Sequence, residues 1–420
     1  MKLNLINSTI LVSSIVSSTA FATNGYFRHG YGHNSAAMAG ATTASAQDAI
    51  AGAYNPGSIW QLKDQISIDF SIFMPDRQFK VSGSEQQDIP MQQMPLAIGT
   101  TESNNSAFLI PNFGYKTTLN DKWAINITAF AQGGMNTSYA QSVFGAGSTG
   151  VDLSQLFVSS SFAYKVSADT QIGFAPIFVH QRFEAKGVGS FASFSSSPQA
   201  LSNQGHDNSF GYGYRLGLVH KLTEHLTLGA SFQDIVELSK FDKYQGLFAE
   251  QGRFDIPTTW NLGVAWQQND WTLTLDQQTI QYSKVASIGQ GFMPAFGNIM
   301  MGNSDYLLGA DQGAGFGWRD MRITKAGVAY NLGKNTLRAG LSYGKQPIPN
   351  SEVLFNILAP GVQEWHFTAG FEHQLKNGDA VALSVMYSPK KQISGIHPVS
   401  QQQEISLSME QIELTLGYRF

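Results

Sequence analysis

Apolar and polar residues alternate along most of the chain, beginning near residue 64. Ile66, Ile68 and Phe70 are separated by single polar residues, and the final stretch QIELTLGYRF shows the same period of two. An alternation of this kind predicts β-strands that have one apolar and one polar face. Fourteen strands are predicted in this way, at about residues 65–73, 106–119, 123–132, 155–166, 171–183, 210–222, 226–235, 258–267, 271–282, 321–332, 336–345, 363–375, 380–388 and 405–420.

The connections between these strands alternate between short and long. Short polar turns occur at 119–122, 167–170, 222–225, 268–271, 332–335 and 375–379. Long loops occupy 74–105, 133–154, 184–209, 236–257, 283–320, 346–362 and 389–404. Short turns at one rim, long loops at the other and an even number of strands are typical of bacterial outer-membrane barrels. Because lipid offers no partner to an unpaired strand edge, we predict an all-β membrane protein with a closed, 14-stranded antiparallel transmembrane β-barrel.

The alternation also assigns the two faces of each strand. Phe367 and Phe371 are expected to face lipid, which leaves Glu372 in the lumen. The period slips at two places, 319–328 and 409–412. A β-bulge, which inserts one extra residue into a strand, would explain each slip.

Both ends of the chain point to export to an outer membrane. Residues 1–22 have a short basic start, an apolar stretch and the small-x-small pattern Ala20-Phe21-Ala22, which predicts a cleaved signal peptide and a mature chain that begins at Thr23. The apolar stretch is too short to span a bilayer as a helix, which needs about 20 residues. The terminal strand ends in Phe420 and resembles the closing strand of outer-membrane barrels. The alternative for that strand is a half-buried edge strand of a soluble β-protein.

Composition excludes several classes of function. The 420 residues include no cysteine, so no disulfide framework is expected, and a net charge of −4 argues against a nucleic-acid partner. No spacing of Ser, His and acidic residues predicts a catalytic triad. His29 and His33 are separated by glycines that disfavour a metal-binding helix. We therefore predict no cofactor, no metal and no enzyme activity; an outer-membrane phospholipase-like barrel is the enzyme alternative.

Charged residues of both signs are predicted in the lumen. The negative residues are Asp69, Asp276, Glu372 and Glu413, and the positive residues are Lys165, Arg215, Arg338 and Arg419. Buried charges are normally paired, so the first interpretation is a set of ion pairs that fix the wall. In the second interpretation, one or two cations hold an anionic headgroup such as a carboxylate. Lys165, Arg215 and Arg338 are the candidates for that role.

The long loops are unusually apolar for surface loops. Candidate ligand-binding residues in them are Phe191, Phe194, Leu247, Phe248, Phe292, Met293, Phe296 and Met300. Phenylalanine and methionine form adaptable apolar surfaces, and exposed patches of this kind usually mark binding sites. Alternatively these side chains pack the loops against each other. A packed loop cap with a groove would satisfy both interpretations.

The stretch NGYFRHGYGHNSAAMAGATTASAQDAIAGAYNPGSI (24–59) closely resembles the N-terminal region of the FadL/TodX family of outer-membrane channels for hydrophobic compounds. The matching elements are Ala37-Met38-Ala39-Gly40, Asp48-Ala49 and Asn55-Pro56-Gly57, where Gly57 replaces the usual alanine. DIPTTWNLGVAW (255–266) and WRDMRITKAGVAYNL (318–332) are also similar to the family. The resemblance covers essentially the whole mature chain.

The resemblance implies a plug, or hatch, at residues 23–63 inside a barrel formed by 64–420. Asp48, Asn55, Pro56 and Gly57 would belong to this hatch. It further implies that apolar loops capture the ligand and that a kink in the third strand releases it sideways into the membrane. Gly133 and Gly134, at the end of that strand, are the candidate lateral gate, unless they only begin the next loop.

The resemblance also implies hydrophobic small molecules as ligands, outer-membrane lipid and lipopolysaccharide as surroundings, and a monomer. Long-chain fatty acids are the first expectation for the substrate. The main alternative is an uptake channel for monoaromatic hydrocarbons or related apolar growth substrates. A pocket cation would favour the fatty acid, and an aromatic pocket without one would favour the hydrocarbon. A general porin is the alternative from another class.

Overall fold

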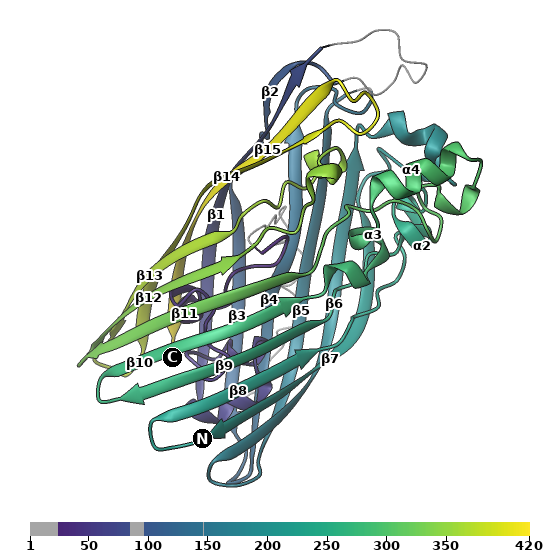
Figure 1. The fold of residues 1–420 in the computed structure, drawn as a ribbon. Coiled ribbons are helices and arrows are strands. Elements are labelled where there is room, and N and C mark those ends of the chain that lie inside the picture. The colour runs from purple at the N-terminus through teal and green to yellow at the C-terminus, as the bar shows by residue number, and fades with distance from the viewer. Residues whose placement is uncertain (1–23, 85–95, 146) are drawn as a thin grey trace, which may run out of the picture.

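The wall of the molecule is one antiparallel sheet that closes on itself (Figure 1). The computed structural model describes residues 24–84, 96–145 and 147–420, so the predicted signal peptide at 1–22 lies outside the described residues. The strands are β1 (Gln65–Gly83), β2 (Gly99–Glu102), β3 (Phe108–Thr118), β4 (Trp123–Tyr139), β5 (Thr149–Lys165), β6 (Thr170–Lys186), β7 (Asp207–Lys221), β8 (Leu226–Gln233), β9 (Thr259–Gln268), β10 (Trp271–Ile280), β11 (Met321–Leu332), β12 (Asn335–Gly344), β13 (Trp365–Gln374), β14 (Ala380–Ile396) and β15 (Gln403–Arg419).

The barrel is closed by pairing between the first and last strands. The β1–β15 ladder runs without a break from Ser67↔Arg419 to Gly83↔Gln403. β2 pairs with a stretch of β1 beyond the β3 ladder, so the closed wall consists of the other fourteen strands. The predicted 14-stranded antiparallel barrel is confirmed, and β2 is an addition that the sequence did not indicate.

The two faces of the wall differ as the alternation predicts. On β13, Phe367 and Phe371 are exposed on the outer face, whereas His366 and Glu372 are buried on the inner face. Leu416 on β15 is likewise exposed. Apolar side chains therefore cover the outside, where lipid is the solvent, and polar side chains line the inside.

Several strands extend further than their alternation predicted. β1 continues to Gly83, β4 continues to Tyr139, β5 already begins at Thr149, and β14 continues to Ile396. The predicted loops 74–105, 133–154 and 389–404 are correspondingly shorter. Beyond the lipid-facing band, outward residues no longer need to be apolar, so the period of two disappears from the sequence although the backbone pairing continues.

Two ladders contain irregularities in register. The β4–β5 register shifts between Ala131 and Gly134, and the β14–β15 register shifts between Ser388 and Lys391. The second shift is a bulge in β14, because residues 388–391 of β14 lie opposite only residues 409–411 of β15. β15 itself has no bulge: its ladder with β1 is unbroken, and Met409, Gln411 and Glu413 are all buried on the inner face. The bulge predicted at 409–412 is therefore wrong. The period changes there because Met409 belongs to the apolar core inside the barrel, whereas Ile412 is exposed on the outer face.

The other predicted slip, at 319–328, is not a bulge. The β10–β11 ladder continues from Trp271↔Tyr330 to Ile280↔Met321 without a shift. Met321 and Ile323 are buried on the inner face, while Arg322 between them is exposed. Near this rim the loops fill the barrel with an apolar core, so the inward residues become apolar and the usual pattern is reversed.

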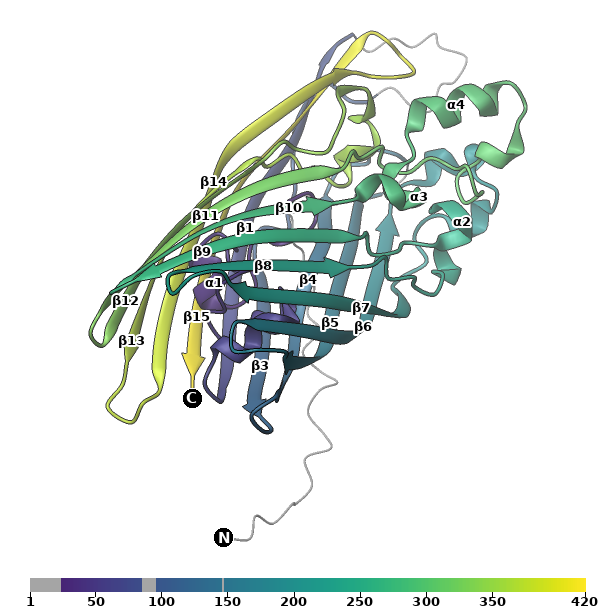
Figure 2. The same ribbon diagram turned by 60° about the horizontal axis from the view of Figure 1, so that its bottom comes forward.

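Residues 24–63 form a segment that lies inside the barrel, drawn in purple in Figures 1 and 2. Its helical turns are short: α1 (His33–Ala37), η1 (Ala51–Ala53) and η2 (Pro56–Gln61). Most of its side chains are nevertheless buried, because the wall surrounds them. Glycines in the wall permit this close approach, since a Cβ atom added at Gly173 or Gly217 would overlap Pro56 or Asn55.

The loops at the other end of the barrel form a second packed region. It contains α2 (Ala249–Gly252), α3 (Ala286–Gly289) and α4 (Phe292–Met300), which Figure 1 shows grouped beyond the ends of β6 and β7. The loops from 184–209, 236–257 and 283–320 all contribute buried aromatic or aliphatic side chains to one cluster. This end of the barrel is therefore capped by an apolar layer.

Candidate functional site

The Asn55-Pro56-Gly57 turn connects the N-terminal segment to the wall. The Asn55 side chain accepts a hydrogen bond from Gly57 N at 3.0 Å and so caps η2, in which Pro56 is the first residue. Its Nδ2 donates to Thr43 O at 2.8 Å and to Leu218 O on β7 at 3.0 Å. One buried amide therefore fixes two parts of the segment and one wall strand.

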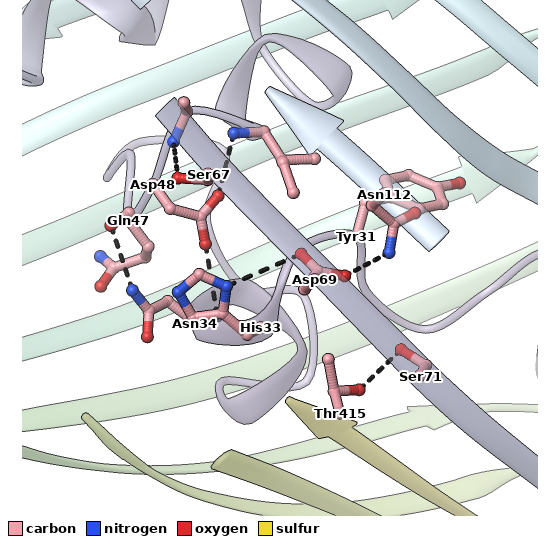
Figure 3. Close-up of polar contacts among 12 residues, drawn as sticks. Tyr31, His33, Asn34, Gln47, Asp48, Ser67, Asp69, Ser71, Asn112 and Thr415 are labelled. Carbon is pink, nitrogen blue, oxygen red and sulfur yellow. Dashed lines mark hydrogen bonds and ion pairs between the residues drawn. The ribbon is translucent and has the colours of Figure 1, made fainter. Parts of the chain in front are cut away.

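His33 lies where the N-terminal segment meets two wall strands (Figure 3). Its Nδ1 is 3.6 Å from Asp69 Oδ2 on β1, the contact drawn in Figure 3. On its other side, Nε2 is 3.9 Å from Glu372 Oε2 on β13. Burial disfavours the charged imidazole, but the contacts with Asp69 and Glu372 and the charge of Asp48 outweigh burial and raise the pKa of His33 to about 9. His33 is therefore charged at neutral pH and ties the segment to the wall.

Asp48 shapes the chain around His33 (Figure 3). Its Oδ2 accepts a hydrogen bond from Asn34 N at 3.3 Å, and the neighbouring Ala49 N donates to Ser67 Oγ on β1 at 3.2 Å. Burial raises the pKa of the Asp48 carboxyl, and the nearby positive charge of His33 opposes that increase. The carboxylate thus stabilises both the local backbone and the charged histidine.

The predicted luminal acids are held by pairing and hydrogen bonding. Glu372 Oε1 lies 3.1 Å from Arg419 Nη2 and 3.9 Å from Arg338 Nη2, and Glu413 pairs with Arg28. Asp276 Oδ2 accepts a hydrogen bond from Thr43 N of the N-terminal segment at 2.8 Å. The sequence missed Arg28 as a partner because alternation assigns faces only to strand residues, and Arg28 precedes the first strand.

The three cations predicted to hold a headgroup are separated in the structure. Each contacts a different part of the N-terminal segment. Lys165 Nζ lies 5.7 Å from the ring centroid of Trp60, Arg215 donates to the backbone oxygen of Ala53, and Arg338 Nε donates to Gln47 Oε1 at 3.4 Å. The structure does not gather them around one cavity.

Arg77 on β1 is a buried cation that the sequence missed, because it lies in the stretch predicted as a loop. Its side chain is 2% exposed, Nη2 donates to Asn105 O at 2.7 Å, and the guanidinium carbon is 5.5 Å from the ring centroid of Phe108. Nε has no hydrogen-bond partner, and within the described ranges Arg77 forms no ion pair with a carboxylate. A small cavity is lined by Arg77 together with Gly25, Met135, Asn136, Trp318, Ala359, Pro360 and Gly361.

The apolar loop residues predicted to bind ligand fall into two groups. Phe191, Phe248 and Phe292 are buried, and Phe194, Leu247 and Phe296 are partly buried against them; Met293 and Met300 are exposed on α4. Phe355, from the loop 346–362, joins Phe191 and Phe292 with ring centroids 4.9 and 4.8 Å apart. Phe355 was missed although its loop, QPIPNSEVLFNILAPGV, is also rich in apolar residues.

A narrow apolar cavity lies in this loop layer. It is lined by Val151, Phe183, Val188, Phe191, Leu247, Phe248, Ser287, Leu308, Ala314, Gly315, Phe316, Phe355 and Leu358. Its volume is about 30 Å³, which is room for about one water molecule. A larger apolar molecule can enter only if these side chains move apart.

The wall is interrupted between β3 and β4. Their ladder ends at Phe113↔Ala129, although β4 continues to Tyr139. At the register shift, the N-terminal segment takes the place of the neighbouring strand: Arg28 N donates to Gln132 O at 3.0 Å, and Gly134 N donates to Tyr26 O at 3.1 Å. Gly133 and Gly134 are therefore part of the strand irregularity, not of the following loop.

Gly133 allows this contact because it has no side chain. A Cβ atom at that position would lie 2.6 Å from Tyr26 Cδ2 and 2.8 Å from Tyr26 O. Gly133 also forms an isolated antiparallel bridge with Phe27. The backbone of the N-terminal segment thus covers the kinked part of β4.

Among residues 24–84, 96–145 and 147–420, no group of three or more His, Cys, Asp or Glu side chains is arranged to hold a metal ion. No helix in the same ranges combines the length and the apolar character needed to cross a bilayer.

A family model matches residues 9–406, and its description is outer membrane protein transport protein (OMPP1/FadL/TodX). That range is nearly the whole chain. Among curated proteins, no match is found.

Solved structures with the same fold include two toluene transporters. TodX from Pseudomonas putida has 18% sequence identity and a TM-score of 0.66, and the match covers 93% of this chain and 98% of that chain. TbuX from Ralstonia pickettii has 18% identity and a TM-score of 0.61, with coverage of 93% and 98%. A FadL homologue from Pseudomonas aeruginosa has 15% identity and a TM-score of 0.68, with coverage of 94% and 99%. At these identities the likeness establishes the fold.

Proposed function

Because this chain belongs to the OMPP1/FadL/TodX family of outer membrane transport proteins, we propose that its substrates are long-chain fatty acids. Family membership makes the protein an outer-membrane transporter of hydrophobic compounds and not an enzyme. The substrate within that class is our inference, and one residue supports it.

Arg77 is the observation that carries the proposal. Burying a cation is costly unless an opposite charge compensates for it, and the described contacts of Arg77 include no carboxylate. A fatty acid brings that carboxylate with it. Its alkyl chain would lie against the apolar neighbours Met135 and Trp318, which line the same cavity.

The proposed route has three parts. The loop layer around Phe191 and Phe355 captures the alkyl chain, Arg77 receives the carboxylate, and the interruption beside Gly133 leads sideways into the membrane. The N-terminal segment covers this interruption, so we propose that it acts as the hatch and that Tyr26–Arg28 must move for release.

Uptake along this route is proposed to be passive. Moving an alkyl chain from water into an apolar cavity contributes about 0.8 kcal/mol per CH₂ group. The loop cavity and the inner cavity have volumes of about 30 and 10 Å³, so they provide this contribution only after their side chains move apart, whereas the membrane provides it directly. The final state, a fatty acid in the lipid layer, remains favourable without another energy source.

The loop layer itself favours a second candidate. Its narrow cavity is lined by several aromatic rings, including Phe191, Phe248 and Phe355, which could pack against a monoaromatic hydrocarbon once they move apart. Two of the solved structures with this fold are described as toluene transporters. A neutral hydrocarbon would give Arg77 no charge compensation, and for that reason we rank the fatty acid first.

The two candidates are separated by uptake measurements in a strain that lacks this gene. Labelled oleate and toluene are supplied to cells that express the wild-type protein, Arg77→Gln or, as a control, Arg322→Gln, which alters an exposed arginine on β11. We expect Arg77→Gln to lower oleate uptake about tenfold and to leave toluene uptake unchanged. Arg322→Gln should match the wild type for both compounds.

Other outcomes would redirect the assignment. Uptake of toluene without uptake of oleate would establish the hydrocarbon as substrate. If Arg77→Gln had no effect on oleate uptake, the proposed carboxylate site would be wrong. Equal uptake with and without the gene for both compounds would contradict transport of either class.

A further inference from the structure

The outer surface of the wall carries a polar cavity beside the interruption between β3 and β4. It has a volume of about 380 Å³. Its lining includes the side chains of Asn136, Asp152, Arg182, Glu184, Lys186 and His206. They belong to β4, β5, β6 and the residue just before β7, near the ends of these strands that carry the long loops.

The register shift in β4 places a polar residue on the outer face of the wall. Before the shift, Phe130 faces inward opposite Phe157; after it, Met135 faces inward opposite Leu153. The inward parity changes from even to odd, so Asn136 points outward. Its Nδ2 donates to Asp152 Oδ1 on β5 at 3.0 Å.

The cavity begins where the lipid-facing band ends. On β5 the outward residues Leu156 and Val158 are exposed and apolar, whereas Asp152, nearer the rim, is polar. On β6 the same change occurs between Phe174, which is exposed, and Arg182. A side chain at this height on an outer-membrane barrel faces the headgroups of the outer leaflet rather than its acyl chains.

The charges of the cavity are nearly balanced and closely spaced. Arg182 Nη2 lies 3.9 Å from Asp152 Oδ2, and Lys186 Nζ lies 3.1 Å from Glu184 Oε2. Lys186 is about half exposed, so its ammonium can turn toward a ligand. The lining thus offers both cationic donors and carboxylate acceptors, which suit phosphate and sugar hydroxyl groups respectively.

His206 lies between a donor and an acceptor of the cluster. Its Nε2 lies 2.7 Å from Arg182 Nη2 and 3.0 Å from Asp152 Oδ2. This nitrogen can accept a hydrogen bond from the arginine or donate one to the carboxylate, but not both. A ligand phosphate next to Arg182 would accept from the guanidinium and leave His206 free to donate to Asp152.

We propose that this outer cavity binds the phosphorylated sugar headgroup of lipopolysaccharide. The cavity lies at headgroup height, it presents donors and acceptors together, and it has room for a sugar ring with its phosphate. The proposal rests on the location of the protein in the outer membrane and not on the identity of the transported substrate.

The position of the cavity connects it to the wall interruption. Asn136 lines both this outer cavity and the inner cavity that contains Arg77. A headgroup bound here would cover the polar end of the interruption and place its own acyl chains against the apolar part of the wall. The interruption would then face lipid rather than water.

The test measures binding of purified lipopolysaccharide to the full mature protein in detergent by native mass spectrometry. The double variant Arg182→Gln/Lys186→Gln removes both cations. The matched control Arg322→Gln/Lys345→Gln removes one arginine and one lysine that are exposed near the same rim, at β11 and just after β12. Heat-modifiable gel mobility verifies that both variants form the barrel.

We expect the Arg182/Lys186 variant to bind lipopolysaccharide at least tenfold more weakly and the control to bind like the wild type. Lipid A without phosphates should bind weakly to all three proteins, and excess oleate should not compete. Equal weakening in both variants would mean general attraction to the rim and would overturn the proposal. Unchanged binding in the Arg182/Lys186 variant, or displacement by oleate, would overturn it as well.

Discussion

Asn55 joins three pieces of backbone that are far apart in sequence: Gly57, Thr43 and Leu218 on β7. We predict that Asn55→Ala reduces oleate uptake several-fold while the barrel still assembles. Loss of an N-terminal cap of a helical turn costs about 1 kcal/mol, and the buried groups left without partners add to that cost. Uptake by cells that express equal amounts of the variant measures the effect.

Asn120→Ala is the matched control for this substitution. Asn120 caps an exposed turn by accepting hydrogen bonds from Lys122 N and Trp123 N, away from the N-terminal segment. Uptake by this control should be normal. If Asn55→Ala also transported normally, the turn would not control passage.

His33 makes the attachment of the N-terminal segment dependent on pH. Its pKa rises from about 6.5 to about 9 in the folded protein, so its ionic contacts contribute fully below pH 6.5 and are lost as the pH rises through 9. The shift corresponds to roughly 3 kcal/mol of stability of the folded state relative to the unfolded chain at low pH. We predict that the ion conductance of the purified protein in planar bilayers increases between pH 7 and pH 10.

The variant His33→Gln serves as the control for this pH dependence. It lacks the titrating group, so its conductance should already be raised at pH 7 and should change little up to pH 10. A wild-type conductance that stays flat over this interval would show that His33 does not hold the segment in place.

Some residue positions could be predicted from the sequence and others could not. The faces of Phe367 and Glu372 follow from alternation, because lipid and lumen impose opposite demands on neighbouring positions. Arg77 could not be found in this way, since the apolar signal ends before it. Arg28 and His33 lie outside any strand, and their partners come from β1, β13 and β15, so only the folded structure shows that they meet.

At the level of elements, the irregular part of β4 depends on a residue without a side chain. We predict that Gly133→Val lowers oleate uptake at least fivefold, because the new side chain would displace Tyr26 and narrow the interruption of the wall. Overpacking of this kind typically costs about 1–3 kcal/mol. The measurement is uptake at equal surface expression.

Gly189→Val is a suitable control, since no atom lies within 4 Å of a Cβ atom placed there. It should leave uptake unchanged. Normal uptake by Gly133→Val would indicate that the ligand does not pass beside β4.

The number of strands and their order could be predicted, whereas their lengths could not. Chain reversals at short polar turns mark one rim clearly, so every predicted turn there lies between two consecutive strands of the wall. At the other rim, β1, β4, β5 and β14 leave the lipid-facing band before they end. Once lipid no longer contacts the outer face, the physical cause of the alternation is gone.

At the scale of the whole molecule, the N-terminal segment and the loop layer together should block the passage of ions through the barrel. We expect the wild-type protein to show little steady ion conductance in planar bilayers at neutral pH. A wide barrel with an unfilled lumen would form an aqueous channel, whereas here side chains of residues 24–63 occupy the interior. Large, steady channels at pH 7 would instead favour a general porin.

The arrangement of the residues inside the barrel was the least predictable feature. The resemblance to a known family indicated a plug and a kink, and the sequence indicated apolar loops. The separation of Lys165, Arg215 and Arg338 depends on the contacts that the N-terminal segment makes, and these contacts have no local pattern. Long-range packing inside a barrel is decided by shape, which alternation does not describe.

The wall glycines Gly173 and Gly217 make the N-terminal segment and the barrel wall respond differently to mutation. Each leaves space that Pro56 or Asn55 occupies, so the inner surface of the wall is complementary in shape to the N-terminal segment. The strands of the wall are held together by continuous hydrogen-bonded ladders, whereas the side chains of the segment are buried mainly by contact with the wall. Larger residues at these glycines should therefore displace the N-terminal segment from a barrel that still folds. Substitutions within the segment should likewise leave the barrel folded, but with an open lumen that conducts ions.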